Sequence, residues 1–155
     1  FQLAPNANGA AAAGHLTRGA AFADVNGDGS LDLLLTTFRK GTLCLLNDGK
    51  GQFTDATAKA GLESRTSGTT LALGDVDRDG DIDVVVANVR GPNELYLNGG
   101  SGMTWVRIPL DGEPYTTYGV AAADLNGDGF ADLGFVNSGG PNRIFMNVEA
   151  GSRRD

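Results

Sequence analysis

The sequence predicts an all-β fold of β-propeller-type blades, formed by three four-stranded repeat units of about 50 residues each. A nine-residue acidic motif begins at residues 24, 75 and 124, so successive copies lie 51 and 49 residues apart. Between the copies, short apolar runs alternate with clusters of Gly, Pro, Asn and Asp, which is typical of strands and turns. The 24 glycines, without a collagen period, indicate many tight turns.

Three of the strands in each unit surround the motif. A run of small apolar residues precedes it, a β-branched or leucine-rich run follows it, and a third run comes after a glycine-containing turn. These runs occupy residues 19–24, 32–38 and 41–47, then 69–75, 83–89 and 91–98, then 119–124, 132–138 and 140–147. Small side chains in the first run suit the innermost strand of a blade, where little room remains near the axis.

The remaining, outer strand of each unit is expected to start at an aromatic residue. Phe1, Phe53 and Trp105 stand 52 residues apart. The chain is therefore divided as one domain, 1–155, with units at about 1–50, 51–101 and 102–155 and the outer strand first in each. Ala56 to Ser64 is the one weakly helical stretch, and Cys44, within the apolar run TLCLL, is expected to be buried.

The repeated motif has the composition of a calcium-binding loop. Acidic or amide side chains occupy positions 1, 3, 5 and 9, glycine occupies position 6, and the variable residue at position 7 is expected to offer its backbone carbonyl. Hard oxygen ligands suit Ca²⁺, whereas Mg²⁺ demands stricter octahedral geometry and Zn²⁺ prefers His or Cys. The predicted ligands of three Ca²⁺ ions are Asp24, Asn26, Asp28, Ser30 and Asp32; Asp75, Asp77, Asp79, Asp81 and Asp83; and Asp124, Asn126, Asp128, Phe130 and Asp132.

Neither a metal-free turn nor an EF-hand accounts for the motif as well. Polar turns without a metal would account for one such loop, but three loops with the same ligand spacing are hard to explain in that way. The loops are not EF-hands, because position 12 is Leu35, Val86 or Phe135, where that motif needs a bidentate Glu.

The pattern D-x-[DN]-x-D-G-x-x-D between two strands, fullest in FADVNGDGSLDLLL, resembles the FG-GAP/VCBS repeats of integrin-α-like β-propellers. The resemblance covers all three units, although the literal Phe-Gly and Gly-Ala-Pro signatures of that family are not intact here. It implies Ca²⁺ bound between the first two strands of each blade, at positions 1, 3, 5 and 9. It also implies an extracellular, secreted or cell-surface protein, where millimolar calcium suits several loops of moderate affinity.

The charge of the chain excludes some partners. A net charge of −7 and a pI near 4.5 argue against binding to nucleic acid and to anionic membrane surfaces. No apolar run approaches the ~20 residues needed to span a bilayer, so membrane insertion is not expected. Three bound Ca²⁺ ions would bring the net charge to about −1, so metal binding explains much of the acidity.

Three classes of function compete. The first is a non-catalytic module acting in self-assembly or adhesion, with Ca²⁺ rigidifying each blade. The second is a propeller-type lectin that binds a glycan; the aromatic residues available to stack on sugars are Trp105, Tyr96, Tyr115 and Tyr118, of which the last two are favoured because GEPYTTYG resembles an exposed loop. The third is an enzyme, which is disfavoured because the single histidine, His15, has no spaced catalytic partner.

Self-assembly is expected from the distribution of the strands. The segment FQLAP, residues 1–5, aligns with the outer strands at Phe53 and Trp105, whereas the third unit has no clear outer strand after residue 147. A head-to-tail homo-oligomer, either a ring or a filament, would let residues 1–5 of one copy complete the last blade of another. The alternatives are a fragment of a longer propeller and an N-terminal strand that folds back onto its own third unit.

Overall fold

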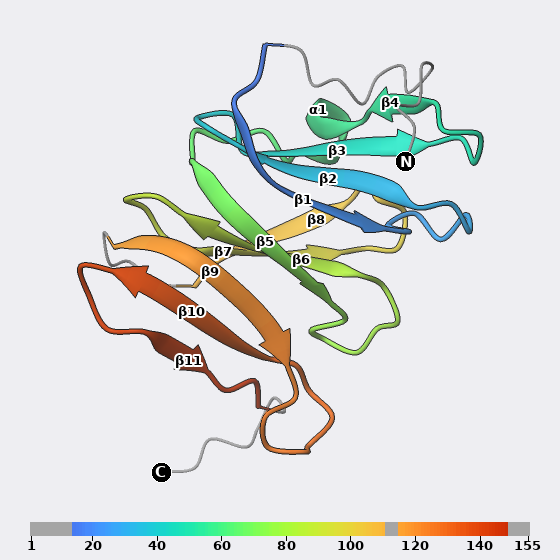
Figure 1. Ribbon diagram of the computed structural model, residues 1–155. Coiled ribbons are helices and arrows are strands. Elements are labelled where there is room, and N and C mark those ends of the chain that lie inside the picture. The colour runs from blue at the N-terminus through green and yellow to red at the C-terminus, as the bar shows by residue number, and fades with distance from the viewer. Residues whose placement is uncertain (1–13, 111–114, 149–155) are drawn as a thin grey trace, which may run out of the picture.

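The structure is a computed structural model that describes residues 14–110 and 115–148. It confirms the all-β prediction, with three antiparallel sheets in sequence order (Figure 1). The first sheet contains β1 (Thr17–Ala23), β2 (Asp32–Thr37), β3 (Thr42–Asn47) and β4 (Phe53–Asp55). The second contains β5 (Gly68–Gly74), β6 (Asp83–Asn88), β7 (Glu94–Asn98) and β8 (Trp105–Pro109). The third contains β9 (Thr116–Ala123), β10 (Asp132–Ser138) and β11 (Arg143–Phe145).

The strand pairing follows the repeat. Each sheet is a meander, and the aromatic-led strands β4 and β8 hydrogen-bond to the third strand of the preceding unit, with Phe53 opposite Asn47 and Trp105 opposite Asn98. Within the described residues the first two sheets have four strands and the third has three, so no outer strand follows β11 there, as the sequence suggested for the end of the third unit. Residues 1–5, which were predicted to form an outer strand, lie outside the described part of the chain.

The three sheets pack against one another through apolar side chains. Leu34 and Cys44 of the first sheet meet Val84 and Val86 of the second in one core cluster. A second cluster joins the opposite face of the second sheet to the third sheet, where Phe135 is buried. The first strands β1, β5 and β9 consequently lie side by side and run in the same direction, with the second sheet between the other two (Figure 1).

The first strands approach closely because their small residues leave room. A Cβ on Gly19 of β1 would lie 2.9 Å from the Cα of Thr70 in β5, and a Cβ on Gly68 would lie 2.6 Å from the Cβ of Thr36. Thr69 of β5 also donates from its hydroxyl to the carbonyl of Thr117 in β9 at 2.5 Å. Glycine at these positions therefore sets the spacing between neighbouring sheets.

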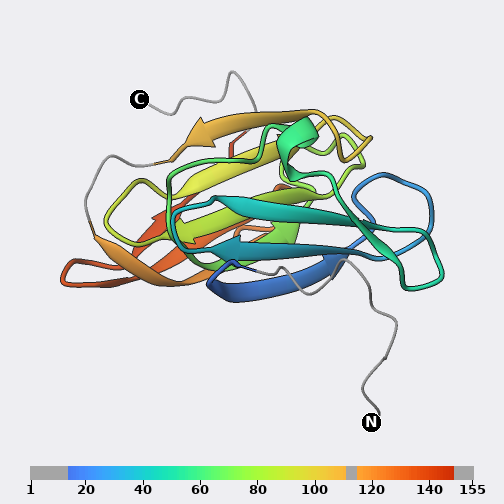
Figure 2. The same cartoon turned by 90° about the horizontal axis from the view of Figure 1, so that it is seen from above.

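The weakly helical stretch forms a single turn, α1 (Thr57–Ala60), beside the outer part of the first sheet (Figures 1 and 2). Ala56, Ala60 and Leu62 are buried in the cluster between the first two sheets, which explains the helical turn at this point. Cys44 is buried as expected, and burial raises the pKa of its thiol to about 12. Among the described residues no helix is long and apolar enough to cross a membrane.

Candidate metal centre

Each of the three acidic loops connects the first strand of a sheet to its second strand. Position 1 follows the last residue of β1, β5 or β9, and position 9 is the first residue of β2, β6 or β10. The loops therefore lie together at one end of the three stacked sheets (Figures 1 and 2). Positions 4 and 6 have positive φ in every loop, which turns the backbone around the side chains of positions 1 to 5. Glycine occupies these positions except at Arg78, where φ is 64°.

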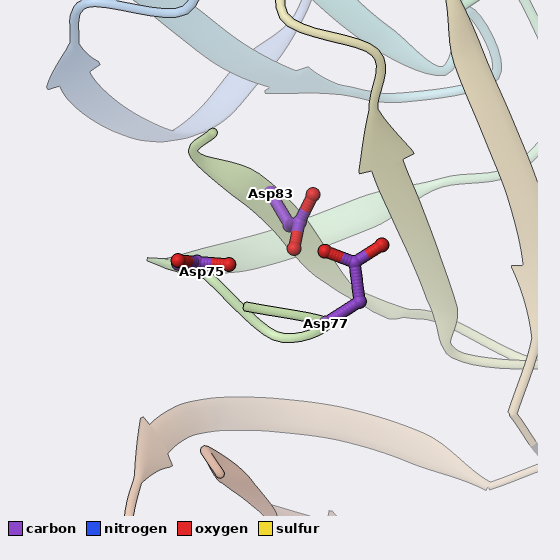
Figure 3. Close-up of side chains that lie close together, drawn as sticks. All are labelled: Asp75, Asp77 and Asp83. Carbon is purple, nitrogen blue, oxygen red and sulfur yellow. The ribbon is translucent and has the colours of Figure 1, made fainter. Parts of the chain in front are cut away.

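The second loop gathers three carboxylates. One oxygen from each of Asp75, Asp77 and Asp83 lies within 4.8 Å of the others, and the three side chains face one another (Figure 3). Asp75 Oδ1 is buried and has no hydrogen-bond partner within the described residues. An ionised oxygen without a partner is costly to bury, so this atom fits a site that a cation completes.

The pKa values of this loop reflect the crowding of negative charge. Burial raises the pKa of Asp77, and the charge of Asp79 raises it further. Burial also raises the pKa of Asp83 at position 9, although backbone N–H groups of Asn98 and Val76 act in the opposite direction. A bound cation would favour the ionised form of both groups.

The first and third loops share one hydrogen-bond pattern. In the first loop Asp24 accepts hydrogen bonds from the backbone N–H groups of Gly27 and Gly29, both at 2.8 Å. Asp28 accepts from the N–H of Ser30 at 2.8 Å, and this bond lowers its pKa. The equivalent bonds in the third loop are Gly127 N to Asp124, 2.7 Å, Gly129 N to Asp124, 2.9 Å, and Phe130 N to Asp128, 2.9 Å.

The side chain at position 3 differs between the loops. In the first and third loops it is an Asn amide that donates to the position 5 carboxylate, Asn26 to Asp28 at 3.0 Å and Asn126 to Asp128 at 2.8 Å. In the second loop it is the carboxylate Asp77, whereas Asp79 at position 5 accepts from the N–H of Asp81 at 2.9 Å, as the equivalent residues do in the other two loops. The structure thus places oxygen atoms at positions 1, 3 and 5 in all three loops, with the most negative set in the second.

The position 9 carboxylates have a structural task of their own. Asp32, Asp83 and Asp132 are buried, and each accepts one backbone N–H from position 2 of its loop. The other oxygen accepts, at 2.8 Å in every sheet, the backbone N–H of an asparagine: Asn47 and Asn98 end β3 and β7, and Asn147 lies two residues after the end of β11. These three carboxylates therefore fix the loop to its own sheet, and their further lone pairs remain for a metal ligand role.

Two of these asparagines also connect neighbouring sheets, a role that the sequence patterns did not predict. Asn98 Nδ2 donates to the carbonyl of Val25 in the first loop at 2.8 Å, and Asn147 Nδ2 donates to the carbonyl of Val76 in the second loop at 2.7 Å. We call these two bonds the inter-sheet latches. The regular spacing of Asn47, Asn98 and Asn147 was the available signal, because it matches the spacing of the loops.

Neighbouring loops also touch directly. The guanidinium of Arg78, in the second loop, lies 4.8 Å from the ring centre of Phe130, in the third. This cation–π contact joins the second loop to the third. It also shows that position 7 of the third loop uses its side chain in packing, which agrees with a ligand role for the backbone carbonyl rather than the ring.

The residues considered for other functions have different environments. Tyr96 is buried and donates to Glu94 at 2.8 Å, so it is a packing residue. Tyr118 is 65% exposed, but it lies on β9 and not in a loop as predicted. His15 lines a pocket of about 320 Å³ with Asp55, Lys59 and others, and its Nδ1 has no hydrogen-bond partner within residues 14–110 and 115–148.

The stacked sheets, with an acidic loop after the first strand of each, define a β-repeat protein. The FG-GAP-like repeat family matches residues 24–86 and 75–135, and the chain belongs to this family. Over 52 residues the chain is 46% identical to Cartilage acidic protein 1 of Homo sapiens and, over the same length, 44% identical to the Mus musculus protein of that name. Each match covers 33% of this chain and 8% of the relative, so the chain spans only a small part of these proteins.

Proposed function

We propose that this chain is a non-catalytic, calcium-binding repeat module of the extracellular space that acts in self-assembly or adhesion. The observation that carries the proposal is the buried, unpartnered Oδ1 of Asp75, which lies in a group of three carboxylates. The loop that holds this group recurs in all three sheets with the same backbone turn. Because crowded carboxylates repel one another, a cation in each loop would stabilise the fold.

Calcium suits these loops better than other common metals. The ligands would be the side chains at positions 1, 3, 5 and 9 and the carbonyl at position 7, all of them hard oxygen atoms. The ion would cross-link the first and second strands of a sheet at the loop between them. The latches from Asn98 and Asn147 end at the carbonyls of Val25 and Val76, so a rigid loop would also position the neighbouring sheet.

An extracellular location follows from calcium supply. Loops of moderate affinity, with dissociation constants of about 10⁻⁴ to 10⁻³ M, are filled in extracellular fluid but not in the cytosol. Membership of the FG-GAP-like repeat family and the partial similarity to Cartilage acidic protein 1 support this location. The stacked sheets would then be the blades of a calcium-stabilised propeller.

Thermal unfolding with and without chelator tests the calcium proposal. A ligand at about 100 times its dissociation constant adds ~2.7 kcal/mol per independent site, so chelation should lower the melting temperature substantially. Asp28→Ala and Asp128→Ala should each remove one calcium, counted by elemental analysis, whereas Glu63→Gln, outside the loops, should remove none. An unchanged melting curve in excess chelator, with no metal co-purifying, would contradict the assignment.

The non-catalytic assignment is tested at His15. No hydrogen-bond partner of its Nδ1 is present in the described part of the chain to orient or activate the imidazole. We therefore expect His15→Ala to leave folding and binding functions nearly unchanged. Loss of a defined hydrolytic or redox activity in that variant, with an unchanged melting curve, would show that the protein is an enzyme.

Self-assembly would occur at the edge of the third sheet. Within the described residues β11 has a strand on one side only, whereas the third strands of the other sheets pair with β4 and β8. An open strand edge exposes unpaired backbone groups and favours pairing with another strand. By analogy with the register of β4, a strand formed by residues 1–5 of a second copy would place Gln2 opposite Met146. Two chains of three sheets would form six blades, within the usual four to eight of closed propellers.

Mixed single-cysteine variants test this contact. Gln2→Cys and Met146→Cys proteins, mixed in calcium under mild oxidation, should form a disulfide-linked dimer that neither variant forms alone. The double variant distinguishes the fold-back alternative, because it would then give a cross-linked monomer. Deletion of residues 1–5 should dissociate the assembly while calcium binding persists. A compact monomer at high protein concentration would refute the assembly.

A further inference from the structure

A basic pocket of about 670 Å³ is lined by residues near the start of β1, β5 and β9. These strands begin at the end of the sheets opposite the acidic loops (Figure 1). Four arginines line the pocket: Arg18, Arg39, Arg65 and Arg90. Among the described residues that line it, none is Asp or Glu. Residues from all three sheets contribute, since Arg18 belongs to β1, Thr69 to β5 and Tyr118 to β9.

Within the described part of the chain, no ion pair compensates the positive charge of this pocket. Within residues 14–110 and 115–148, none of the four arginines has a carboxylate oxygen within 4.0 Å of its side-chain nitrogens. Glu63 lines an adjoining hollow with Arg39 and Arg65, but it forms no ion pair with them. In a chain of net charge −7, four guanidinium groups that line one pocket, without a carboxylate partner among the described residues, create a local site of positive potential.

Two of these arginines occupy backbone positions that favour glycine. Arg39 and Arg90 have φ of 63° and 53°, and the equivalent residue of the third sheet is Gly139, with φ of 81°. A residue with a Cβ is unfavourable in this conformation, whereas glycine suits it. The third repeat has glycine at this position, but the first two have arginine despite the backbone cost. Hydrogen bonds hold both turns in place, from Arg39 N to Ser67 Oγ at 3.2 Å and from Arg90 N to Tyr115 O at 3.3 Å.

Aromatic residues orient the guanidinium groups and offer a stacking surface. The ring of Phe38 lies 5.2 Å from the guanidinium carbon of Arg18 and 5.1 Å from that of Arg39, so one ring fixes two cations. Tyr118 lies at the same pocket and is 65% exposed. Thr116 adds a hydroxyl group to the wall.

We propose that this pocket binds a sulfated oligosaccharide. Guanidinium groups bind oxyanions through paired hydrogen bonds, and four of them can engage several sulfate groups on one ligand. An exposed tyrosine ring and a threonine hydroxyl suit the apolar face and the hydroxyl groups of a sugar, and the volume is within the ~300–1,000 Å³ typical of small-ligand pockets. Nucleic acid fits less well, because the acidic loops and the net charge would repel a long polyanion. The proposal that the pocket binds an anion does not depend on where the protein is located. The choice of a sulfated sugar, rather than a phosphate ligand of the cytosol, rests on the proposed extracellular function.

Titration calorimetry with a heparin-derived hexasaccharide, in millimolar calcium, tests the proposal. The full chain should bind the sulfated hexasaccharide and not the same hexasaccharide after chemical desulfation. The double variant Arg39→Gly with Arg90→Gly should lose about tenfold in affinity for each arginine removed. These glycines suit the turns, so the variant should fold, and its melting curve in calcium checks this. Lys50→Gln removes one positive charge from the turn between β3 and β4 and should bind like the parent chain.

Several results would overturn the proposal. Equal binding by the double variant and by the parent chain would show that the pocket is not the site. Equal affinity for the desulfated sugar, or equal competition by a hexaglutamate peptide, would show that the ligand class is wrong. Absence of binding by a parent chain whose melting temperature still rises with calcium would refute the anion site and leave the calcium function intact.

Discussion

The inter-sheet latch at Asn98 gives the sharpest test of how the sheets are held together. Asn98 is 3% exposed, and its Nδ2 donates to the carbonyl of Val25 in the neighbouring sheet at 2.8 Å and to that of Ile82 at 3.2 Å. Its Oδ1 accepts the N–H groups of Gly100 and Gly102. Asn98→Ala removes all four bonds but keeps the backbone N–H that donates to the loop carboxylate.

The chain contains a matched control for this substitution. Asn47 makes the same local bonds in the first sheet, to the carbonyl of Leu31 and from the N–H groups of Gly49 and Gly51. No inter-sheet bond of its Nδ2 is found within the described residues. The difference between Asn98→Ala and Asn47→Ala therefore isolates the bond to Val25.

The expected difference follows from the cost of a buried carbonyl without a partner. That cost is ~1–3 kcal/mol, so Asn98→Ala should lower the free energy of unfolding by about 2 kcal/mol more than Asn47→Ala. In a chain of this size that corresponds to a melting temperature lower by roughly 4–8 °C. Urea unfolding of both variants in saturating calcium measures the difference. Equal destabilisation, or a larger effect of Asn47→Ala, would refute the latch.

Three further predictions follow from particular residues. Gly68→Ala should destabilise the fold by about 1–3 kcal/mol in urea unfolding, because the new Cβ would lie 2.6 Å from Thr36 Cβ. Gly91→Ala is the control and should have little effect, because no atom lies within 4 Å of its new Cβ. The Cys44 thiol, with a pKa of about 12, should stay protonated at about pH 8 and resist a thiol-specific reagent until the protein unfolds; rapid labelling of the folded protein would contradict its burial. In chelator, Asp77→Asn should stabilise the protein near neutral pH, because the raised pKa of Asp77 means that its ionised form destabilises the fold. This gain in the free energy of unfolding should vanish at acidic pH, where Asp77 is protonated. A constant gain at all pH values would exclude this cause.

The sequence by itself determined the local features of this protein. The strands before and after each loop, the turn glycines and the oxygen-bearing side chains at positions 1, 3, 5 and 9 follow from short patterns that recur about every 50 residues. The family relationship follows from the same loops, because their spacing does not depend on distant contacts. The short turn α1 was indicated only weakly, since the burial of Ala56 and Ala60 between two sheets determines it.

Only the tertiary structure decided how separate repeats meet. The bond from Asn98 to Val25 joins residues 73 positions apart, and it exists because the first and second sheets stack with their loops at the same end. The burial of Tyr96 against Glu94 and the exposure of Tyr118 depend on which face of each strand is covered. The basic pocket likewise needs three strand ends brought together, since a guanidinium carries the same charge anywhere in a sequence and becomes a binding group only when others lie beside it.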